Sequence, residues 1–352
     1  MADFSETLAA YRQAIDKGMA KYFASKDSGL GLALGVYDKK ALAYLKEFST
    51  RPGKRIRGAL AVFAYETLSG KQNPDAIELG IAVELIQNYL LIVDDVMDSS
   101  ATRRGKPTIH KLFEKDYKTS EHEANMLAIN VGLIAQHMAS YLLCSVDENP
   151  RHVADAMKLF QRNIAATCYG QLDDLFNNIL TLSHDELMHM YEYKNSYYTF
   201  INPLQLGAVM AGRGNKKILD QIVEIGLPAG VAFQLRDDLL GLLGEQQATG
   251  KSNMDDMREG KQTLLMRYTM ERANQAERKQ VESALGDPNL TAKTHKQVQQ
   301  IVVKSGAAEQ LEKKTKKLCQ QAKIQIAAAD FWDANAKQFL DDLLDFVINR
   351  KA

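Results

Sequence analysis

The feature that most constrains this chain is an apolar helical segment that ends in acidic residues. Residues 81–94 read Ile-Ala-Val-Glu-Leu-Ile-Gln-Asn-Tyr-Leu-Leu-Ile-Val-Asp, which is apolar on nearly every side of a helix. A helix of this kind is buried inside a large protein, because an amphipathic surface helix would carry one polar face. A second apolar segment, residues 227–233, also runs into a pair of aspartates.

Helical periodicity continues along the rest of the chain. Only 7 of the 352 residues are proline, so few helix breakers interrupt it. No alternation typical of strands, no βαβ rhythm, no repeat and no linker is evident. We therefore predict an all-α fold, with residues 1–352 as one domain whose interior is too wide for a simple four-helix bundle.

Charge and composition exclude several classes of protein. Lys plus Arg and Asp plus Glu both number 44, which argues against a nucleic-acid or anionic-membrane binder. The three cysteines are too few and too scattered for a disulfide framework or a thiolate zinc site. Residues 1–6 show no signal region, and the apolar stretches are interrupted by polar residues, so we expect no transmembrane segment and a cytoplasmic location.

The first acidic cluster is Asp94-Asp95-Val96-Met97-Asp98. On a helix Asp94 and Asp98 project from one face, while Asp95 points about 100° away. Like charges one turn apart repel, and desolvation at the end of an apolar helix raises the cost, so the pair predicts a bound cation. Mg²⁺ fits, since it is usually held by one or two carboxylates plus substrate phosphates. A solvated helix terminus is the alternative.

The second cluster, Gln234-Leu235-Arg236-Asp237-Asp238, repeats this arrangement. Two acidic rims could face each other across one cavity and chelate a diphosphate through two or more Mg²⁺ ions. Plain surface charge is the alternative here too.

Basic residues accompany both clusters. Lys54 and Arg57 are three residues apart, which predicts neighbours on one helix face. Arg103 and Arg104 follow the first cluster within one loop. Lys194, Lys251 and Lys261 lie near the later segments. Arg forks and Lys point charges bind phosphate oxygens, so the set predicts a polyanionic ligand. Scattered solvent-facing cations are the alternative, especially for Lys251 and Lys261.

Taken in order, these motifs resemble those of the trans-isoprenyl diphosphate synthases over nearly the whole chain. The matching segments are Gly53-Lys54-Arg55-Ile56-Arg57, Asp94–Asp98, Arg103–Thr108, Gly170-Gln171-Leu172-Asp173-Asp174, Phe233–Asp238, Gly250-Lys251 and Asp256–Lys261. The resemblance implies an isoprenoid-synthase helical bundle around a deep central cavity, and a homodimer.

The resemblance also implies a reaction, the head-to-tail condensation of isopentenyl diphosphate with an allylic diphosphate. The allylic diphosphate would bind through two or three Mg²⁺ ions held by Asp94, Asp98 and Asp237, assisted by Arg103, Lys194 and Lys251. Isopentenyl diphosphate would bind to Lys54, Arg57, Gln87 and Arg104. Four further residues are expected to contact substrate: Gln171, Asp174, Gln234 and Lys261.

Two positions depart from the family pattern. Where many members have a third aspartate in the second motif, this chain has Gly241, as do archaeal and actinobacterial geranylgeranyl-type synthases. Where the family has Lys-Thr, this chain has Lys194-Asn195, so Asn195, Ser196 or Thr199 would have to take over a contact made by the Thr hydroxyl.

Tyr89 and Leu90 bear on product length. Tyr89 lies five residues before Asp94, where its ring could form the floor of the tail pocket, and Leu90 is smaller than the aromatic of many farnesyl-type enzymes. With no insertion in the first motif, this resembles synthases of the C20 product, geranylgeranyl diphosphate, with C15 farnesyl diphosphate as the alternative. Tyr89 as an ordinary core residue is the structural alternative.

Three other functions compete with prenyl transfer. They are a catalytically silent prenyl-binding subunit of a heteromeric synthase, a Mg²⁺-dependent terpene cyclase and a plain helical scaffold. Retention of both acidic and basic sets argues against the first, the second basic set against the cyclase, and the ordered motifs against the scaffold.

Overall fold

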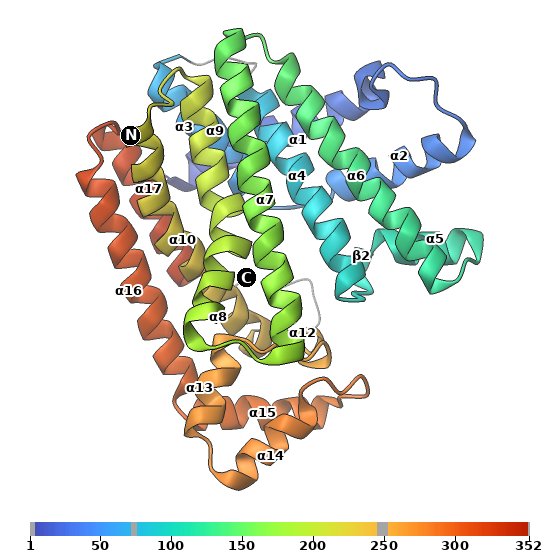
Figure 1. Cartoon of the computed structure of the whole chain (residues 1–352), viewed down its shortest axis with the longest axis vertical. Helices are drawn as coiled ribbons and strands as arrows, with labels where there is room; N and C mark the ends of the chain where they lie inside the picture. Colours follow the sequence, from blue (N-terminus) through green and yellow to red (C-terminus); the bar gives the residue numbers. More distant parts are fainter. Residues whose placement is uncertain (1–3, 72–75, 245–252, 351–352) are drawn as a thin grey trace. The chain divides into compact units, whose positions relative to one another are not determined.

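The computed structural model describes residues 4–71, 76–244 and 253–350. Apart from turns and loops, its described residues form helices and one short hairpin, β1 (Thr102–Arg103) with β2 (Lys106–Pro107), which confirms the all-α prediction (Figure 1). They separate into two compact units, residues 1–162 with 202–220 and residues 163–201 with 221–352. The single domain and the deep central cavity stay predictions.

The first unit contains helices from the amino-terminal part of the chain together with one later helix. They are α1 (Phe4–Ala24), η1 (Lys26–Gly29), α2 (Val36–Ser49), α3 (Ile56–Ser69), α4 (Ala76–Met97), α5 (Ile109–Tyr117), α6 (Glu121–Ser145) and α9 (Asn202–Met210). Two long helices, α7 (Pro150–Leu180) and α10 (Lys216–Leu243), begin in this unit and continue in the second.

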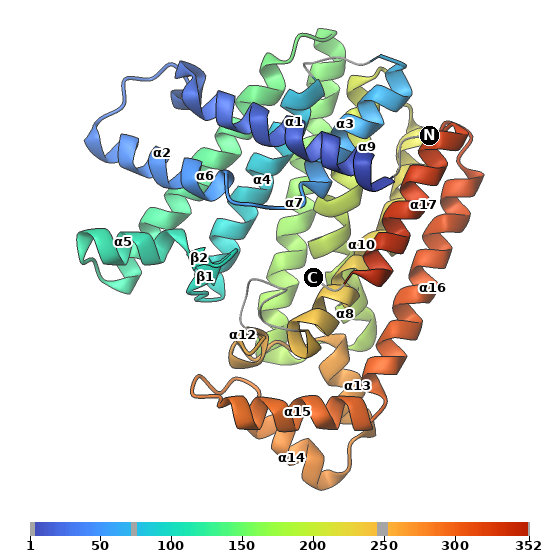
Figure 2. The same ribbon diagram turned by 180° about the vertical axis from the view of Figure 1, so that it is seen from behind.

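Close packing of α4 explains why its sequence is apolar nearly all round. The helix packs against α3 and α6, which lie beside it in both views (Figure 1, Figure 2). A Cβ added to Gly58 of α3 would lie 2.8 Å from the carbonyl oxygen of Gly80 in α4, so only glycine allows this approach. The first Asp cluster therefore sits at the end of a helix fixed on several sides.

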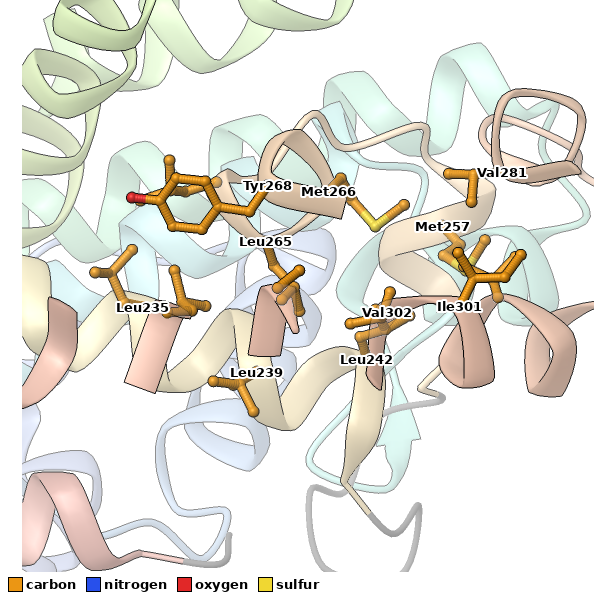
Figure 3. Close-up of a cluster of buried hydrophobic side chains, with 14 of the residues drawn as sticks. Leu235, Leu239, Leu242, Met257, Leu265, Met266, Tyr268, Val281, Ile301 and Val302 are labelled. Atoms are coloured by element: carbon orange, nitrogen blue, oxygen red, sulfur yellow. The ribbon is translucent and has the colours of Figure 1, made fainter. Parts of the chain in front are cut away.

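The second unit contains the remaining elements. They are α8 (His184–Tyr191), the π-helix η2 (Glu192–Ile201), α12 (Asp255–Arg258), α13 (Leu264–Arg272), α14 (Gln275–Ala284), α15 (Ala292–Lys304), α16 (Ala307–Ala328) and α17 (Ala334–Asn349). Their core includes Leu235, Leu239 and Leu242 of α10, packed with side chains of α12, α13 and α15 (Figure 3). At 100° per residue these leucines form one stripe, with Asp238 and Gln234 along one edge of it and Asp237 and Gly241 on the other side of α10.

Two glycines of neighbouring helices allow close packing against the π-helix. A Cβ on Gly170 of α7 would collide with the backbone of Lys194, and one on Gly230 of α10 would collide with Ser196. Because η2 is wider than an α-helix, these neighbours must lack side chains. π-Helical segments often mark functional sites, and this one carries Lys194 and Asn195.

Among the residues that the structure describes, three helices are long and apolar enough to cross a membrane by length and composition alone: α4, α6 and α10. Length and composition alone therefore do not support the expectation of no transmembrane segment, which stays a prediction. Within the protein, 61% of the apolar window of α4 and 56% of that of α10 are buried. Packing inside the fold accounts for much of their apolar character.

Candidate functional site

The first Asp cluster lies at the carboxyl end of α4. The helix ends at Met97, but the amide of Asp98 still donates to the carbonyl of Asp94 at 2.8 Å, so the i, i+4 relation predicted from the sequence is kept. Asp94 and Asp98 are partly exposed, whereas Asp95 is buried. The two predicted ligands are thus the accessible members of the cluster.

A tight hairpin places Arg103 against these carboxylates. Arg104 (φ 55°) and Gly105 (φ 73°) both have positive φ, as a two-residue type I′ turn requires. The sequence indicated only a loop here, because Arg-Gly is not one of the usual pairs for this turn. Arg103 donates through Nε to Asp95 Oδ1 at 2.7 Å, and its Nη2 lies 3.2 Å from Asp94 Oδ2. Burial alone would lower the pKa of Arg103, but Asp95 and Asp94 together raise it above its ordinary value.

The basic motif is arranged differently from its prediction. Helix α3 begins at Ile56, so Lys54 precedes it and does not share a helix face with Arg57. The cause is Arg55, which adopts the left-handed conformation (φ 51°) and is buried. Its guanidinium donates to Asp16 at 2.8 Å and to Glu84 at 3.3 Å, and also to the Ser49 and Arg51 carbonyls. Arg55 therefore fixes the turn that presents Lys54 and Arg57.

Buried Glu84, which sequence analysis missed, connects this motif to α4. It accepts from the Gly58 amide at 3.0 Å and from Arg55. With the Gln87 amide oriented to suit its neighbours, its nitrogen donates to Glu84 at 3.2 Å and its oxygen accepts from Arg57 Nη1 at 3.0 Å. Two predicted ligands of isopentenyl diphosphate, Arg57 and Gln87, are thus brought together.

Arg104 joins the same basic group. Its guanidinium carbon would be 3.4 Å from a Cβ on Gly53, so it lies directly against the basic motif. Burial and the positive charges of Arg55, Arg103 and Arg57 lower the pKa of Arg104, the charge of Glu84 raises it, and the net result is a pKa of about 10. Crowded cations of this kind favour binding of a polyanion, which would relieve their repulsion.

Tyr89 and Leu90 are half-buried on α4, five and four residues before Asp94. A Cβ on Gly132 of α6 would lie 3.4 Å from the Tyr89 ring, so the absence of a side chain on α6 makes room for the ring.

In the second unit, Lys194 and Asp174 form an ion pair of 2.6 Å. They line a cavity of about 60 Å³. Its other lining residues are Asn177, Met190, Tyr191, Asn195, Gln234, Asp238, Asp256, Lys261, Gln262 and Thr263. Gln171 is half-buried on α7, one turn before Asp174. The structure thus brings together five residues predicted from separate motifs: Asp174, Lys194, Asn195, Gln234 and Lys261.

Asp237 has a partner that the sequence did not reveal. Arg350, just after the end of α17, places Nη2 2.7 Å from Asp237 Oδ1 and donates to the Phe233 carbonyl at 2.8 Å. Its guanidinium also stacks on the Phe233 ring at 3.9 Å, and its own carbonyl accepts from Arg236. No local pattern links these residues, because only the tertiary fold brings the chain end to α10.

Asp238 is buried and held by hydrogen bonds. It accepts from the Tyr191 hydroxyl at 2.6 Å and from the Gln234 amide at 2.8 Å, and Tyr191 accepts from the Leu264 amide at 3.0 Å. Burial raises the pKa of Asp238 to about 7, with smaller contributions from the charges of Asp256 and Asp237. Gln234 was predicted to contact substrate, but here its amide supports Asp238.

The remaining predicted positions are at the downstream segment and in η2. Lys261 lies 2.9 Å from Glu259 and 3.8 Å from Asp256, while Lys251 lies outside the described residues. Of the candidates to replace the family Thr, Asn195 lines the cavity, whereas the Ser196 hydroxyl donates to the Leu227 carbonyl. Asn195 is therefore the better placed of these two.

Comparison with known proteins agrees with these motifs. The sequence profile of the polyprenyl synthetase family matches residues 38–303. This chain belongs to the polyprenyl synthetase family. It is 29% identical over 303 residues to a geranylfarnesyl diphosphate synthase of Aeropyrum pernix, covering 85% of this chain and 90% of that protein. It is 31% identical over 271 residues to a farnesyl pyrophosphate synthase of Nezara viridula, covering 74% of this chain but 65% of that relative's length.

A solved structure extends the likeness over the whole fold. The geranylgeranyl pyrophosphate synthase of Corynebacterium glutamicum, in complex with isoprenyl diphosphate and magnesium, superposes with a TM-score of 0.88. Its sequence is 27% identical, and the match covers 99% of each chain.

The acidic residues of this polyprenyl synthetase suit Mg²⁺ by their chemistry. Within the described ranges no three His, Cys, Asp or Glu residues form a ready metal cage. Asp94 and Asp237 instead offer partly exposed carboxylate oxygens, with 20% and 42% of the side chain accessible. Mg²⁺ prefers one or two carboxylates completed by water and phosphate oxygens, so this donor set fits it.

Proposed function

We propose that this chain is a short-chain isoprenyl diphosphate synthase that condenses isopentenyl diphosphate with allylic diphosphates to give geranylgeranyl diphosphate. The chain is a prenyltransferase by family. The observation that carries the proposal is the joining of separate motifs: Arg103 pairs with Asp94, Gln87 with Arg57, and Lys194 with Asp174. Carboxylates beside cations suit a diphosphate, which is bound through metal on one side and directly on the other.

On the allylic side, we propose that Asp94, Asp98 and Asp237 hold two or three Mg²⁺ ions around the diphosphate. Bound Mg²⁺ supplies positive charge that neutralises the leaving diphosphate. Arg103 and Lys194 add fixed positive charge as the C–O bond breaks and its electron pair leaves with the diphosphate. Their carboxylate partners hold both cations in position before substrate arrives. Lys251 is proposed to assist them.

On the isopentenyl side, Lys54, Arg57, Gln87 and Arg104 bind the second diphosphate. The double bond of isopentenyl diphosphate attacks the allylic cation, and a C–C bond forms. A proton is then lost to the released diphosphate, so no nucleophilic side chain is required. Gln171, Asp174, Gln234 and Lys261 complete the proposed substrate contacts.

Product length is proposed from the pocket floor at Tyr89. Gly132 lets the Tyr89 ring fill the space beside α6, and Leu90 leaves room that a larger aromatic would occupy. This supports the C20 product, while the relatives' names span C15, C20 and C25 products. Farnesyl diphosphate is the alternative.

A single incubation series tests the function. The protein is mixed with radiolabelled isopentenyl diphosphate and dimethylallyl, geranyl or farnesyl diphosphate, with and without Mg²⁺, and the products are resolved by chain length. A Mg²⁺-dependent C20 product is expected. No incorporation from any primer would point to the silent subunit, and a cyclised product without isopentenyl diphosphate would point to a cyclase.

We propose that the protein is a homodimer through α6. Six large apolar side chains of this helix are exposed: Met126, Leu127, Ile129, Leu133, Ile134 and Tyr141. At 100° per residue they fall within about 160° of its circumference, and an apolar face of this kind usually marks an interface. Light scattering should give a dimer, and Leu133→Glu should give a monomer.

The cytoplasm is the proposed location. The exposed Cys144 forms no disulfide, as expected in a reducing compartment. Neither nucleic acid nor membrane is a proposed partner, since the chain has no net charge to attract them.

A further inference from the structure

Arg51 lies outside all the motifs matched above, yet only 1% of its side chain is exposed. It follows α2, which ends at Ser49. Its guanidinium stacks on the Phe48 ring at 4.8 Å and donates to Glu47 from Nε at 3.0 Å and from Nη2 at 2.7 Å. A guanidinium stays charged, so burying it costs free energy that an apolar side chain would not. The charge at this position therefore indicates a task besides stability.

The other hydrogen bonds of the Arg51 guanidinium hold the hairpin. Nη1 donates to the Arg103 carbonyl of β1 at 2.9 Å, and Nη2 also donates to the Pro107 carbonyl of β2 at 2.8 Å. These carbonyls lie on the two strands, one on each side of the turn that contains Arg104. The Arg103 side chain already joins the hairpin to the end of α4. Arg51 thus provides a second attachment, which fixes the orientation of the hairpin.

The backbone of Arg51 contacts the basic motif. Its carbonyl accepts from Arg55 Nη2 at 3.0 Å, and Arg104 Nη1 lies 3.5 Å from the same oxygen. Glu47 extends the link, because its Oε1 accepts from Lys106 Nζ of β2 at 2.8 Å. Arg51 therefore binds the hairpin through its side chain and the basic motif through its backbone.

We propose that Arg51 is a positioning residue for the isopentenyl diphosphate site. It docks the hairpin against the basic motif and so holds the Arg104 guanidinium beside that motif. Arg51 touches no substrate and acts through Arg104. The pairing of Arg103 with Asp94 is local to the hairpin and does not need Arg51. The inference rests on the proposed function, because it assumes that Arg104 binds isopentenyl diphosphate.

Steady-state kinetics of Arg51 variants test this role. Arg51→Met removes every donor at similar length, so the KM for isopentenyl diphosphate should rise roughly tenfold to 100-fold while kcat stays near that of wild type. Arg51→Lys keeps the charge beside Glu47, but its single nitrogen cannot replace Nη1 and Nη2 together, so its KM should be intermediate. Tyr44→Phe is the matched control, since Tyr44 is also a buried side chain of α2 but donates to Asp116 of α5, and it should leave both constants unchanged.

A double-mutant cycle separates positioning from a general loss of stability. Once Arg104→Met is present, Arg51→Met should raise the KM for isopentenyl diphosphate by no more than about twofold further. If Arg51→Met is unfolded by circular dichroism, Arg51→Lys takes its place in the cycle. Fold-changes that multiply, an unchanged KM, or a fall in kcat as large as the rise in KM would overturn the inference. Wild-type protein that makes no prenyl diphosphate with Mg²⁺ would instead overturn the proposed function, so the two failures are distinguishable.

Discussion

The two Asp-Asp pairs share a pattern of burial but differ in what holds them. In both, the second aspartate is buried, with Asp95 at 1% and Asp238 at 6% exposure, while Asp94 and Asp237 are more accessible. Asp95 faces an arginine, whereas Asp238 faces a hydroxyl and an amide. The same Asp-Asp pair therefore gives an ion pair with arginine in one unit and hydrogen bonds from uncharged side chains in the other.

The source of the positive charge differs as well. Asp94 meets Arg103 nine residues later through a local hairpin. Asp237 meets Arg350, which lies at the end of the described chain. The first motif is thus assembled by local structure and the second by tertiary folding. We expect the first motif to keep its geometry when remote contacts are lost, and the second to be sensitive to them.

The largest effect is expected for Arg103→Met. It removes the partner of Asp94 and Asp95 and leaves Asp95 buried beside no guanidinium, which costs about 3 kcal/mol in the free energy of unfolding. It also removes charge stabilisation of the leaving diphosphate, so kcat should fall about 10²- to 10³-fold. Urea unfolding and steady-state kinetics measure the two effects. Arg103→Lys should recover part of the stability, and equal stability of Arg103→Met and wild type would contradict the ion-pair role.

The free energy of unfolding is next expected to depend on pH through buried Asp238. Because burial raises the pKa of Asp238 to about 7 in the folded protein, Asp238 keeps its proton where the unfolded chain has lost it. Its contribution to stability is full below about pH 4 and is lost as pH rises to about 7. Asp238→Asn cannot titrate, so the stability of wild type relative to this variant should fall across that range. A difference that does not vary with pH would show that Asp238 is ionised throughout.

The sequence was sufficient for the parts of the site that depend on local order. Helical periodicity predicted that Asp94 and Asp98 share one side at the end of a buried helix, and the structure confirms it. The prediction from periodicity was wrong where one residue's backbone conformation sets the start of a helix: Arg55 is left-handed, so α3 begins after it and excludes Lys54. It also failed for Arg350 and Glu84, whose roles arise only when distant segments meet. Periodicity carries no information about such contacts.

Arg350→Met tests the tertiary assembly of the second motif. Removing the guanidinium from Asp237 takes away a competitor of the divalent cation, so the Mn²⁺ dissociation constant should fall a few-fold. Loss of the contacts to Phe233 should cost about 1 kcal/mol of stability. Lys323→Met is the control, since it breaks another ion pair of the same region, with Asp345 at 2.8 Å. A weaker Mn²⁺ affinity in Arg350→Met would mean that Arg350 positions Asp237 for metal instead of competing with it.

The smallest energetic effect, and the one most specific to the first motif, is expected at the pocket floor. Five residues before Asp94 the chain has Tyr89, whereas five residues before Asp237 it has buried Ala232, and the neighbouring Phe233 ring is stacked against Arg350, so the proposed floor belongs to the first motif. Tyr89→Ala should shift products from C20 to longer chains, and Leu90→Phe should shift them toward C15, with little change in total turnover. Leu91→Ala is the control for a neighbouring half-buried side chain. Because Leu91 points about 200° away from Tyr89 around α4, an equal lengthening in Leu91→Ala would show that the products respond to loosened packing of α4 rather than to the ring.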